Sequence, residues 1–440
     1  MSYLSLTDRD REEMLAAVGV SSVDELFADV PAAVRLRREL DIEPPLAEQE
    51  LTRHLESLAA RNVDTTRELS FLGAGIYDHY VPAVVDAILQ RGEFLTAYTP
   101  YQPELSQGVL QAIFEYQTAI CELTAMDVSN ASGYDGTTVA ADACFVAKHA
   151  TGRSKVVVTE ATNPQVRQVV KTYAPGFGLE VVEVPHQGGT TDPDELRENA
   201  QDAACVIFQQ PNFFGCLEPA PDLAAAANDA EAIPVAHVDP ISLGVLEAPG
   251  NYGCGIAIGE GQGAGNYQSF GGPHYGFLAA RNEFIRRMPG RIVGETLDAA
   301  GKRGYVLTLQ TREQHIRREK ATSNITTNQT LLALAGLVYL SWLGPQGLRE
   351  LGETCIGLAT YARERLGLEA VFPERATFKE FAVRVGRNAN DVIGEAKQHG
   401  VHPGYPLGRD YAGLDDALLI ALTEKRTPDD IERLAKALSR

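Results

Sequence analysis

The stretch that decides the fold is residues 203–244, which read AACVIFQQPNFFGCLEPAPDLAAAANDAEAIPVAHVDPISLG. Two short apolar runs, at 205–208 and 234–238, flank a predicted helix at 222–227. Continuous apolar strands that alternate with helices are typical of strands buried on both faces, as in a parallel sheet. The segment therefore predicts a strand–helix–strand unit of an α/β domain.

The same alternation extends outward from this unit, from about residue 106 to residue 281. Further strands are predicted at 155–159 and 179–184, with helices at 108–123, 165–173 and 194–200. This pattern favours a mostly parallel, doubly wound sheet. We expect three parts: N-terminal helices and an extended arm at 1–105, a large α/β domain at 106–335, and a small C-terminal α+β domain at 336–440.

Composition limits the classes of function. Of the 440 residues 44% are hydrophobic and 22% are charged, which excludes global disorder. The net charge of −20, with 30 Arg and 9 Lys, would repel a phosphate backbone, so we expect no nucleic-acid partner. Six cysteines without a C-x-x-C pair, a polar N-terminus without a signal peptide, and no apolar run of about 18 residues predict a cytoplasmic protein away from membranes.

Three features near the predicted sheet match parts of a pyridoxal-phosphate site. The small residues 130–138, NASGYDGTT, precede a helix, and N–H groups at a helix N-terminus can bind phosphate. Gln210-Pro211-Asn212 follows a strand, where an amide could reach a ring oxygen. Asp239 also follows a strand, where its carboxylate could pair with a pyridinium nitrogen. A helix cap, a turn and a capping aspartate explain the same residues, and the sequence leaves both explanations open.

The lysine that such a site needs is missing. After Lys171 the next lysine is Lys302, and the segment expected to carry the Schiff base, 263–277, reads GAGNYQSFGGPHYGF. Lys302 and Lys320 lie in polar, Arg-rich surroundings, whereas a Schiff-base amine needs a dry pocket. Neither histidine nor cysteine recurs at a metal-ligand spacing, so we expect no protein-bound metal.

Long motifs then point to a family. The chain resembles subunit 1 of the P-protein of the glycine cleavage system, glycine dehydrogenase (decarboxylating), in its split two-subunit form. The motifs that carry the resemblance are FLGAGIYDHYVP at 71–82, the stretch at 94–132, QQPNFFG at 209–215, DPISLG at 239–244, SFGGPHYGF at 269–277 and the stretch at 288–324. At residues 1–65 and in the C-terminal domain only the architecture is similar.

The resemblance implies a type I pyridoxal-phosphate-dependent transferase-like fold and an enzyme that is active only with subunit 2. It implies that subunit 2 holds pyridoxal phosphate on its own lysine, and that glycine loses CO2 while its aminomethyl group passes to the lipoyl arm of the H-protein. The T- and L-proteins act in the same system. The implied assembly is a heterodimer or a dimer of heterodimers.

The resemblance also suggests which residues complete the partner's site. Two phenols and a carboxylate on a proline-stiffened arm would orient glycine or the lipoyl arm; these candidate catalytic residues are Tyr98, Tyr101 and Glu104. A loop that resembles one reaching the partner's phosphate would bind the cofactor from across the interface, through Thr322, Ser323 and Asn324. Arg317 and Arg318 would favour anions nearby. An arm simply buried against the partner is the alternative for residues 98–104.

Two other classes of function remain open on the residues alone. One is a self-sufficient pyridoxal-phosphate enzyme of the aminotransferase or desulfurase kind, which the lysine distribution disfavours. The other is a non-catalytic scaffold that has kept the fold, which the joint presence of the tyrosine arm and the loop near residue 322 disfavours.

Overall fold

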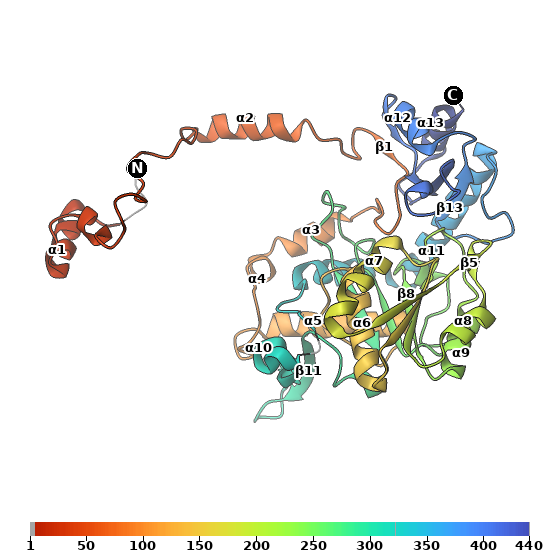
Figure 1. Cartoon of the computed structure of the whole chain (residues 1–440), viewed down its shortest axis with the longest axis horizontal. Coiled ribbons are helices and arrows are strands. Elements are labelled where there is room, and N and C mark those ends of the chain that lie inside the picture. Colours follow the sequence, from red (N-terminus) through yellow and green to blue (C-terminus); the bar gives the residue numbers. More distant parts are fainter. Residues whose placement is uncertain (1–4, 322, 440) are drawn as a thin grey trace. The chain divides into compact units, whose positions relative to one another are not determined.

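The computed structural model describes residues 5–321 and 323–439, in two compact units, Met1–Val63 and Asp64–Arg440 (Figure 1). The first unit holds α1 (Asp8–Val18), a 3-10 turn at Val23–Phe27 and α2 (Glu48–Ala59). Helix α1 begins at a capping box and ends at Gly19, whose φ of 85° suits a glycine. No residue described between 5 and 63 is buried, so this unit has no core of its own.

The second unit is built on a seven-stranded sheet of order β2-β10-β9-β8-β7-β3-β4. Its strands are β2 (Val128–Ser129), β3 (Lys155–Thr159), β4 (Glu180–Val184), β7 (Ala203–Gln210), β8 (Ile233–Val238), β9 (Ile256–Glu260) and β10 (Gly276–Ala280). Only β10 runs antiparallel to its neighbours. The predicted mostly parallel, doubly wound sheet is confirmed.

Helices cover both faces of this sheet. One face packs against α6 (Gly136–Thr151) and α7 (Pro164–Tyr173). The other packs against α5 (Gln107–Thr124), α8 (Pro193–Asn199), α9 (Ala220–Asp229) and the start of α11 (Thr330–Leu366). Because both faces are covered, the strands are apolar along their whole length, as the opening stretch of sequence predicts.

Helix α11 consists of two helices joined across a kink. Gly344 has non-helical backbone angles (φ 62°) and Pro345 follows it. By length and composition alone α11 could cross a membrane. Ala333, Leu337 and Tyr339 of this helix are buried in the cores of the second unit.

The C-terminal part contains a three-stranded antiparallel sheet of order β13-β16-β15. The elements of this C-terminal part are β13 (Glu380–Arg384), α12 (Ala389–Lys397), β14 (Val401–His402), β15 (Tyr405–Pro406), β16 (Ala417–Ala421) and α13 (Pro428–Leu438). They enclose a separate hydrophobic core with Phe381, Leu418 and Ile431 at its centre. This agrees with the predicted α+β character of the tail.

The segment before α5 belongs to the second unit and not to the helices before it. The predicted first part, 1–105, is divided after Val63, because Phe71, Val81 and Val85 are buried in the cores of the second unit. This segment contains β1 (Leu69–Ser70), α3 (Ala83–Leu89) and α4 (Gly92–Leu95), and β1 pairs with β14.

The remaining short elements form two hairpins and one helix. They are β5 (His186–Gln187) with β6 (Thr190–Thr191), β11 (Ile292–Leu297) with β12 (Arg303–Thr308), and α10 (Gln314–Arg317).

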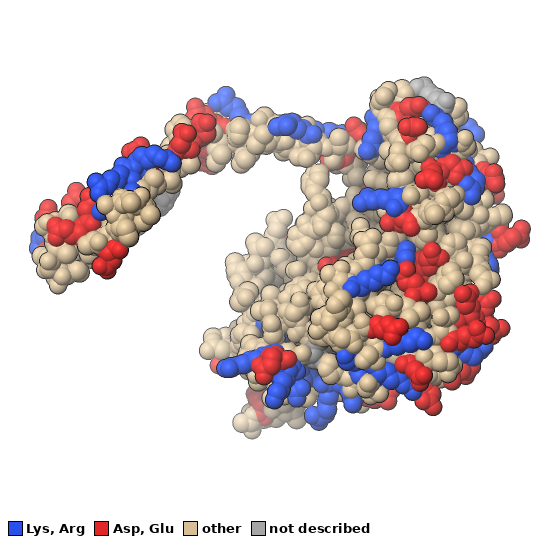
Figure 2. All heavy atoms as spheres, in the orientation of Figure 1, with Lys and Arg blue, Asp and Glu red and all other residues tan. Residues whose placement is uncertain are grey.

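Acidic and basic side chains are interspersed over the face of the molecule that Figure 2 shows, despite the net charge of −20. Basic side chains gather around α10, at the lower left of that view. Arg317, Arg318 and Lys320 there are all exposed. The two arginines that the resemblance suggests would favour anions therefore lie at the surface.

Candidate active site

A small cavity of about 70 Å³ lies at the carboxyl ends of the central strands, where ligands bind in open α/β sheets. It brings together the first residues of α6, the end of β8 and the end of β9. Its lining residues are Ala74, Gly75, Ile76, Tyr77, Gly136, Thr137, Asn163, Gln165, Val166, Gln209, His237, Val238, Asp239, Pro240, Glu260 and Gly263. The predicted phosphate and ring-nitrogen positions are thus brought to one place.

The N-terminus of α6 is already satisfied by two carboxyl groups. The Oδ1 of Asp135 accepts hydrogen bonds from the backbone N–H of Thr137 (2.9 Å) and of Thr138 (2.8 Å). The N–H of Gly136 donates to Oε2 of Glu260 at 2.8 Å. The helix-cap explanation of this motif is confirmed, and the N–H groups that could have held phosphate have protein partners.

Glu260 reaches this position from the end of β9. Its second oxygen accepts a hydrogen bond from the N–H of Gln262 at 3.0 Å. Burial raises the pKa of this carboxyl group to about 8. A carboxyl group therefore stands at the helix N-terminus where a cofactor phosphate would be expected.

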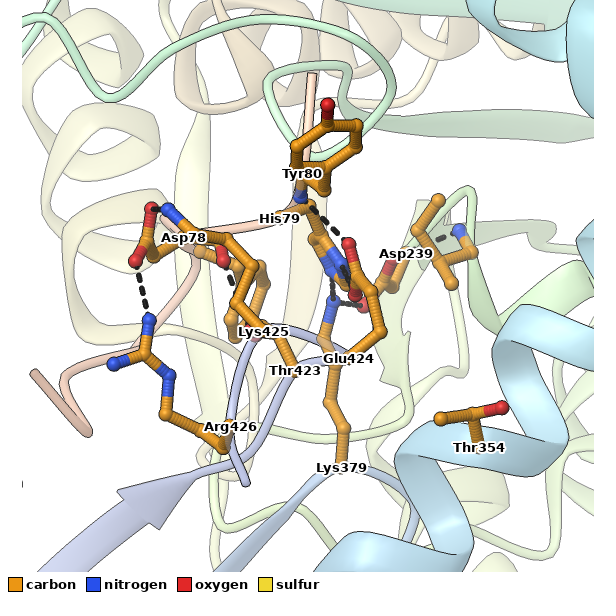
Figure 3. Close-up of polar contacts among 12 residues, drawn as sticks. Asp78, His79, Tyr80, Asp239, Thr354, Lys379, Thr423, Glu424, Lys425 and Arg426 are labelled. Atoms are coloured by element: carbon orange, nitrogen blue, oxygen red, sulfur yellow. Dashed lines mark hydrogen bonds and ion pairs between the residues drawn. The ribbon is translucent and has the colours of Figure 1, made fainter. Parts of the chain in front are cut away.

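Asp239, the predicted partner of a pyridinium nitrogen, is paired with a lysine instead (Figure 3). Its Oδ2 lies 2.5 Å from Nζ of Lys379, whose side chain is 2% exposed. The same Nζ lies 3.0 Å from Nε2 of His79, and Nδ1 of His79 lies 2.7 Å from a carboxylate oxygen of Glu424. Since the ammonium can only donate, His79 accepts at Nε2 and donates from Nδ1.

Aromatic and acidic neighbours complete the surroundings of this lysine. Its Nζ lies 3.4 Å from the ring centroid of Tyr77, a cation–π contact. The Tyr77 hydroxyl donates to Glu380 at 2.7 Å, and burial raises the pKa of Glu380 to about 7. Asp78 forms ion pairs of 2.6 Å with Lys425 and Arg426. Residues 77–79 are therefore tied to the C-terminal part by charged contacts, most of them desolvated.

The residues present do not fit pyridoxal phosphate in this chain. A cavity of about 70 Å³ has room for only a few water molecules, far less than the cofactor needs. Residues 263–277 contain no lysine. The amine of Lys379, which is not among the residues that line the cavity, is held by Asp239 and His79. The N-terminus of α6 and Asp239 at the end of β8 together form what we call the cradle. They have the positions expected for a cofactor site, but their polar groups are occupied by other side chains of the protein.

Asn212, from the second predicted feature, has a structural role. Its Nδ2 donates to the carbonyl oxygen of Gly189 (2.7 Å) and to Glu218 (2.9 Å). Its Oδ1 accepts from the N–H groups of Phe214 and Cys216. The turn explanation is therefore confirmed for this residue. Gln209, two residues before the turn proline, lines the cavity instead.

Three potential metal ligands lie close to the same cluster. One ligand atom from each of His79, Cys355 and Glu424 falls within 4.8 Å of the others. Both ring nitrogens of His79 already contact protein groups, Glu424 and Lys379. Burial raises the pKa of Cys355 to about 12, which opposes the thiolate form that binds metals. The arrangement is that of a hydrogen-bonded core cluster.

The predicted catalytic residues lie elsewhere, on the loop before α5. Tyr101 is anchored: its hydroxyl accepts a hydrogen bond from Arg291 at 3.1 Å, and its ring packs edge-on to His315 at 5.9 Å. Tyr98 is 79% exposed, and Glu104 is also exposed. None of the three lines the cavity at Asp239.

The residue that sequence analysis missed is Arg291. Its guanidinium is 4% exposed and donates to Tyr101 Oη, Thr326 O, Thr327 Oγ1 and Asn328 Oδ1 over 3.0–3.2 Å. It therefore joins the tyrosine loop to residues 326–328. Arg291 lies within the stretch at 288–324 that carries the resemblance, but its role could not be predicted there because its partners lie far away in the sequence.

The predicted cofactor-binding loop is described at two of its three positions. Ser323 accepts from the N–H of Ile325 (3.3 Å), and the Asn324 amide lies 3.4 Å from the hydroxyl of Tyr173. Thr322 lies outside the described residues. Ser323 also forms a hydrogen bond with the buried Asp142 of α6. Burial raises the pKa of this carboxyl group to about 7, although the bond with Ser323 lowers it. The loop thus borders the helix whose N-terminus forms the cradle.

The fold of this chain is that of the type I pyridoxal-phosphate-dependent enzymes. A sphingosine-1-phosphate lyase from Burkholderia pseudomallei shares that fold at a TM-score of 0.64 over 93% of both chains, with 15% sequence identity. A NifS-like protein from Rickettsia africae shares it at a TM-score of 0.61, over 84% of this chain and 98% of that chain, with 13% identity. The predicted fold class is confirmed.

The chain belongs to the glycine cleavage system P-protein family, whose model matches residues 1–438. A probable glycine dehydrogenase (decarboxylating) subunit 1 from Moorella thermoacetica is 51% identical over 100% of this chain and 99% of its own length. One from Geobacillus kaustophilus is 49% identical over 99% and 98%. A crystal structure of an inhibitor-bound glycine decarboxylase (P-protein) superposes with a TM-score of 0.92 and 44% identity, over 100% and 99% of the two chains. The resemblance stated from the motifs is confirmed.

Proposed function

We propose that this chain is subunit 1 of a split glycine-decarboxylating P-protein, active only when a second, cofactor-bearing subunit is bound. The observation that carries the proposal is the cradle closed by Glu260 and Lys379 in a chain whose relatives are named as subunits of a glycine dehydrogenase. A chain that keeps the fold without room for the cofactor needs a partner that holds it. The self-sufficient enzyme is disfavoured for the same reason.

In this proposal subunit 2 holds pyridoxal phosphate, which supplies the electron sink when the carboxylate of glycine leaves as CO2. The aminomethyl group then passes to the lipoyl arm of the H-protein, and the T- and L-proteins complete the cycle in the cytoplasm. The active assembly is a heterodimer or a dimer of heterodimers.

The contribution of this chain is positioning from across the interface. Tyr98 and Tyr101 are exposed and apolar enough to pack against a partner, yet each keeps a polar tip for a substrate carboxylate or a dithiol arm. Arg291 fixes the hydroxyl of Tyr101 by a 3.1 Å hydrogen bond, which limits the movement of that ring. Glu104 on the same loop, together with Thr322, Ser323 and Asn324, is a further proposed contact.

Co-expression with subunit 2 tests this function. We expect the purified chain alone to show no Schiff-base absorbance and no exchange of glycine carboxyl carbon with bicarbonate, and the mixture with subunit 2 to show both. Size-exclusion chromatography checks that the two chains associate. Exchange by this chain alone would favour the self-sufficient enzyme, and an equally active subunit 2 without this chain would favour the non-catalytic scaffold.

Tyr101→Phe is expected to lower the turnover of the assembled enzyme by about tenfold without preventing assembly, because the change removes only one hydroxyl. Carbon exchange at saturating glycine measures the effect. The matched control is Tyr361→Phe, a half-exposed tyrosine on α11, where turnover should stay at the wild-type value. Unchanged turnover in Tyr101→Phe would remove this hydroxyl from the site.

A further inference from the structure

Positive charge is concentrated in one short segment of this acidic chain. Residues 286–320 contain nine Lys and Arg against four Asp and Glu, whereas the rest of the chain contains 30 against 55. The segment is therefore basic in a chain whose net charge is −20. Basic side chains accordingly gather around α10 in Figure 2. We call the exposed residues at its surface the basic loop; they are His315, Ile316, Arg317, Arg318 and Lys320.

The cations of the basic loop are not neutralised within the chain. Arg317, Arg318 and Lys320 form no ion pair and no side-chain hydrogen bond with any residue that the structure describes. Glu319, the acidic residue among them, is also exposed and has no such partner in the described part of the chain. By contrast, the exposed Arg349 pairs with a glutamate one helical turn away at 2.8 Å. Three clustered cations create a positive potential that attracts an acidic partner.

The basic loop stands on a buried and fixed base. Arg312 is 9% exposed and donates to the backbone carbonyl oxygen of Gly290 at 3.1 Å. The Glu313 side chain, 7% exposed, lies 3.7 Å from Nε of Arg291. Arg318 has a φ of 53°, which residues other than glycine rarely adopt and which costs about 1–3 kcal/mol. The base therefore holds the cations in one arrangement, which reduces the entropy lost when a partner binds.

Apolar and aromatic surface adjoins these cations. Ile316 and Tyr101 are each 47% exposed, and the ring of Tyr101 packs edge-on to His315 at 5.9 Å. Exposed arginine and tyrosine side chains are enriched in protein–protein interfaces. A nucleic-acid backbone would need the cations alone, and the net charge of −20 opposes its approach. The combination favours a protein partner whose surface is rich in Asp and Glu.

We propose that the basic loop is the docking face for an acidic protein, and that this protein is the H-protein, the carrier of the lipoyl arm. The identity of the carrier rests on the proposed function, whereas the acidic character of the partner follows from the charges of the loop. His315 contacts Tyr101, the residue proposed to orient the arriving arm. A carrier that binds here through its carboxylates therefore brings its arm to the tyrosine loop. Because salt screens such attraction, its affinity falls as ionic strength rises.

The test measures binding of the H-protein to the assembled enzyme, this chain with subunit 2, by calorimetric titration at low and at high salt. We expect Arg317→Glu/Arg318→Glu to raise Kd at least about tenfold at low salt and to remove most of the salt dependence. Arg317→Lys/Arg318→Lys keeps both charges and should stay within about threefold of the wild type. The matched control is Arg433→Glu/Lys436→Glu, which reverses two exposed cations on α13 and should bind like the wild type.

Four results would overturn the proposal. They are unchanged affinity in a folded Arg317→Glu/Arg318→Glu variant, an equal loss in the α13 control, wild-type affinity that does not fall with salt, and tighter binding of duplex DNA than of the H-protein. Loss of association with subunit 2 in size-exclusion chromatography would also overturn it, because the loop would then belong to the subunit interface. If the double variant does not fold, Lys320→Glu takes its place, with Kd expected to rise about threefold.

Failure of the docking face and failure of the proposed function give different results. Exchange of glycine carboxyl carbon by the wild-type assembly, together with H-protein binding that charge reversal leaves unchanged, would reject the docking face alone. Absence of that exchange in the wild-type assembly would reject the proposed function, and the binding measurements would still decide whether the basic loop binds the acidic carrier.

Discussion

Lys379→Met is expected to lower the free energy of unfolding by about 3–5 kcal/mol, the cost of removing one partner of a buried ion pair. Asp239 would keep a charge in the core with no cation at 2.5 Å, and His79 would lose the donor to its Nε2. Methionine matches the length of the lysine stem, so little packing is lost. Urea denaturation of the full-length chain, followed by circular dichroism, measures the change.

Lys425→Met is the control for this prediction. Lys425 also pairs with a carboxylate, but its side chain is 31% exposed and Asp78 keeps its second partner, Arg426. The expected loss is therefore below about 1 kcal/mol. Adding Asp239→Asn to Lys379→Met should recover much of the stability, because the uncompensated charge is gone. A double variant as unstable as Lys379→Met would show that the lysine acts through packing.

Strands and helices of this fold were predictable because their signals are local. The strand at 155–159 has the bounds that its run of apolar residues predicts. Strands β9 and β10 were missed because glycines interrupt them. A β-carbon at Gly259 would lie 2.3 Å from the ring of Phe277, so this glycine is required by the packing between two strands. Such a requirement depends on a neighbour in space.

Only part of the candidate site could be predicted, because only some of its residues follow local sequence patterns. Asp239 and the residues before α6 follow local patterns of strand end and helix start, and the structure brings both to one cavity. The roles of Glu260 and Lys379 could not be predicted, because each contacts residues that only the fold brings near. The one signal for Lys379 is a charged pair inside an apolar run, at Phe378-Lys379-Glu380-Phe381. A buried lysine in such a run needs a carboxylate partner.

Arg291→Lys is expected to reduce turnover of the assembled enzyme by about 10- to 100-fold, more than Tyr101→Phe, because it releases two segments at once. Lysine keeps the positive charge near Glu313, which lies 3.7 Å from the arginine Nε. It cannot form the fork of four hydrogen bonds that joins Tyr101 to residues 326–328. The loss of these bonds should also cost about 2–4 kcal/mol of stability.

Separate measurement of kcat and KM distinguishes positioning from simple destabilisation. Below the melting temperature of the variant, a folded Arg291→Lys chain should still assemble with subunit 2 but show a lower kcat with KM for glycine changed less. If Arg291 acts through Tyr101, adding Tyr101→Phe to Arg291→Lys should lower kcat little further, since the hydroxyl has already lost its anchor. Fully additive losses would mean that the two side chains act independently, and wild-type turnover in Arg291→Lys would place the tyrosine loop outside the active site.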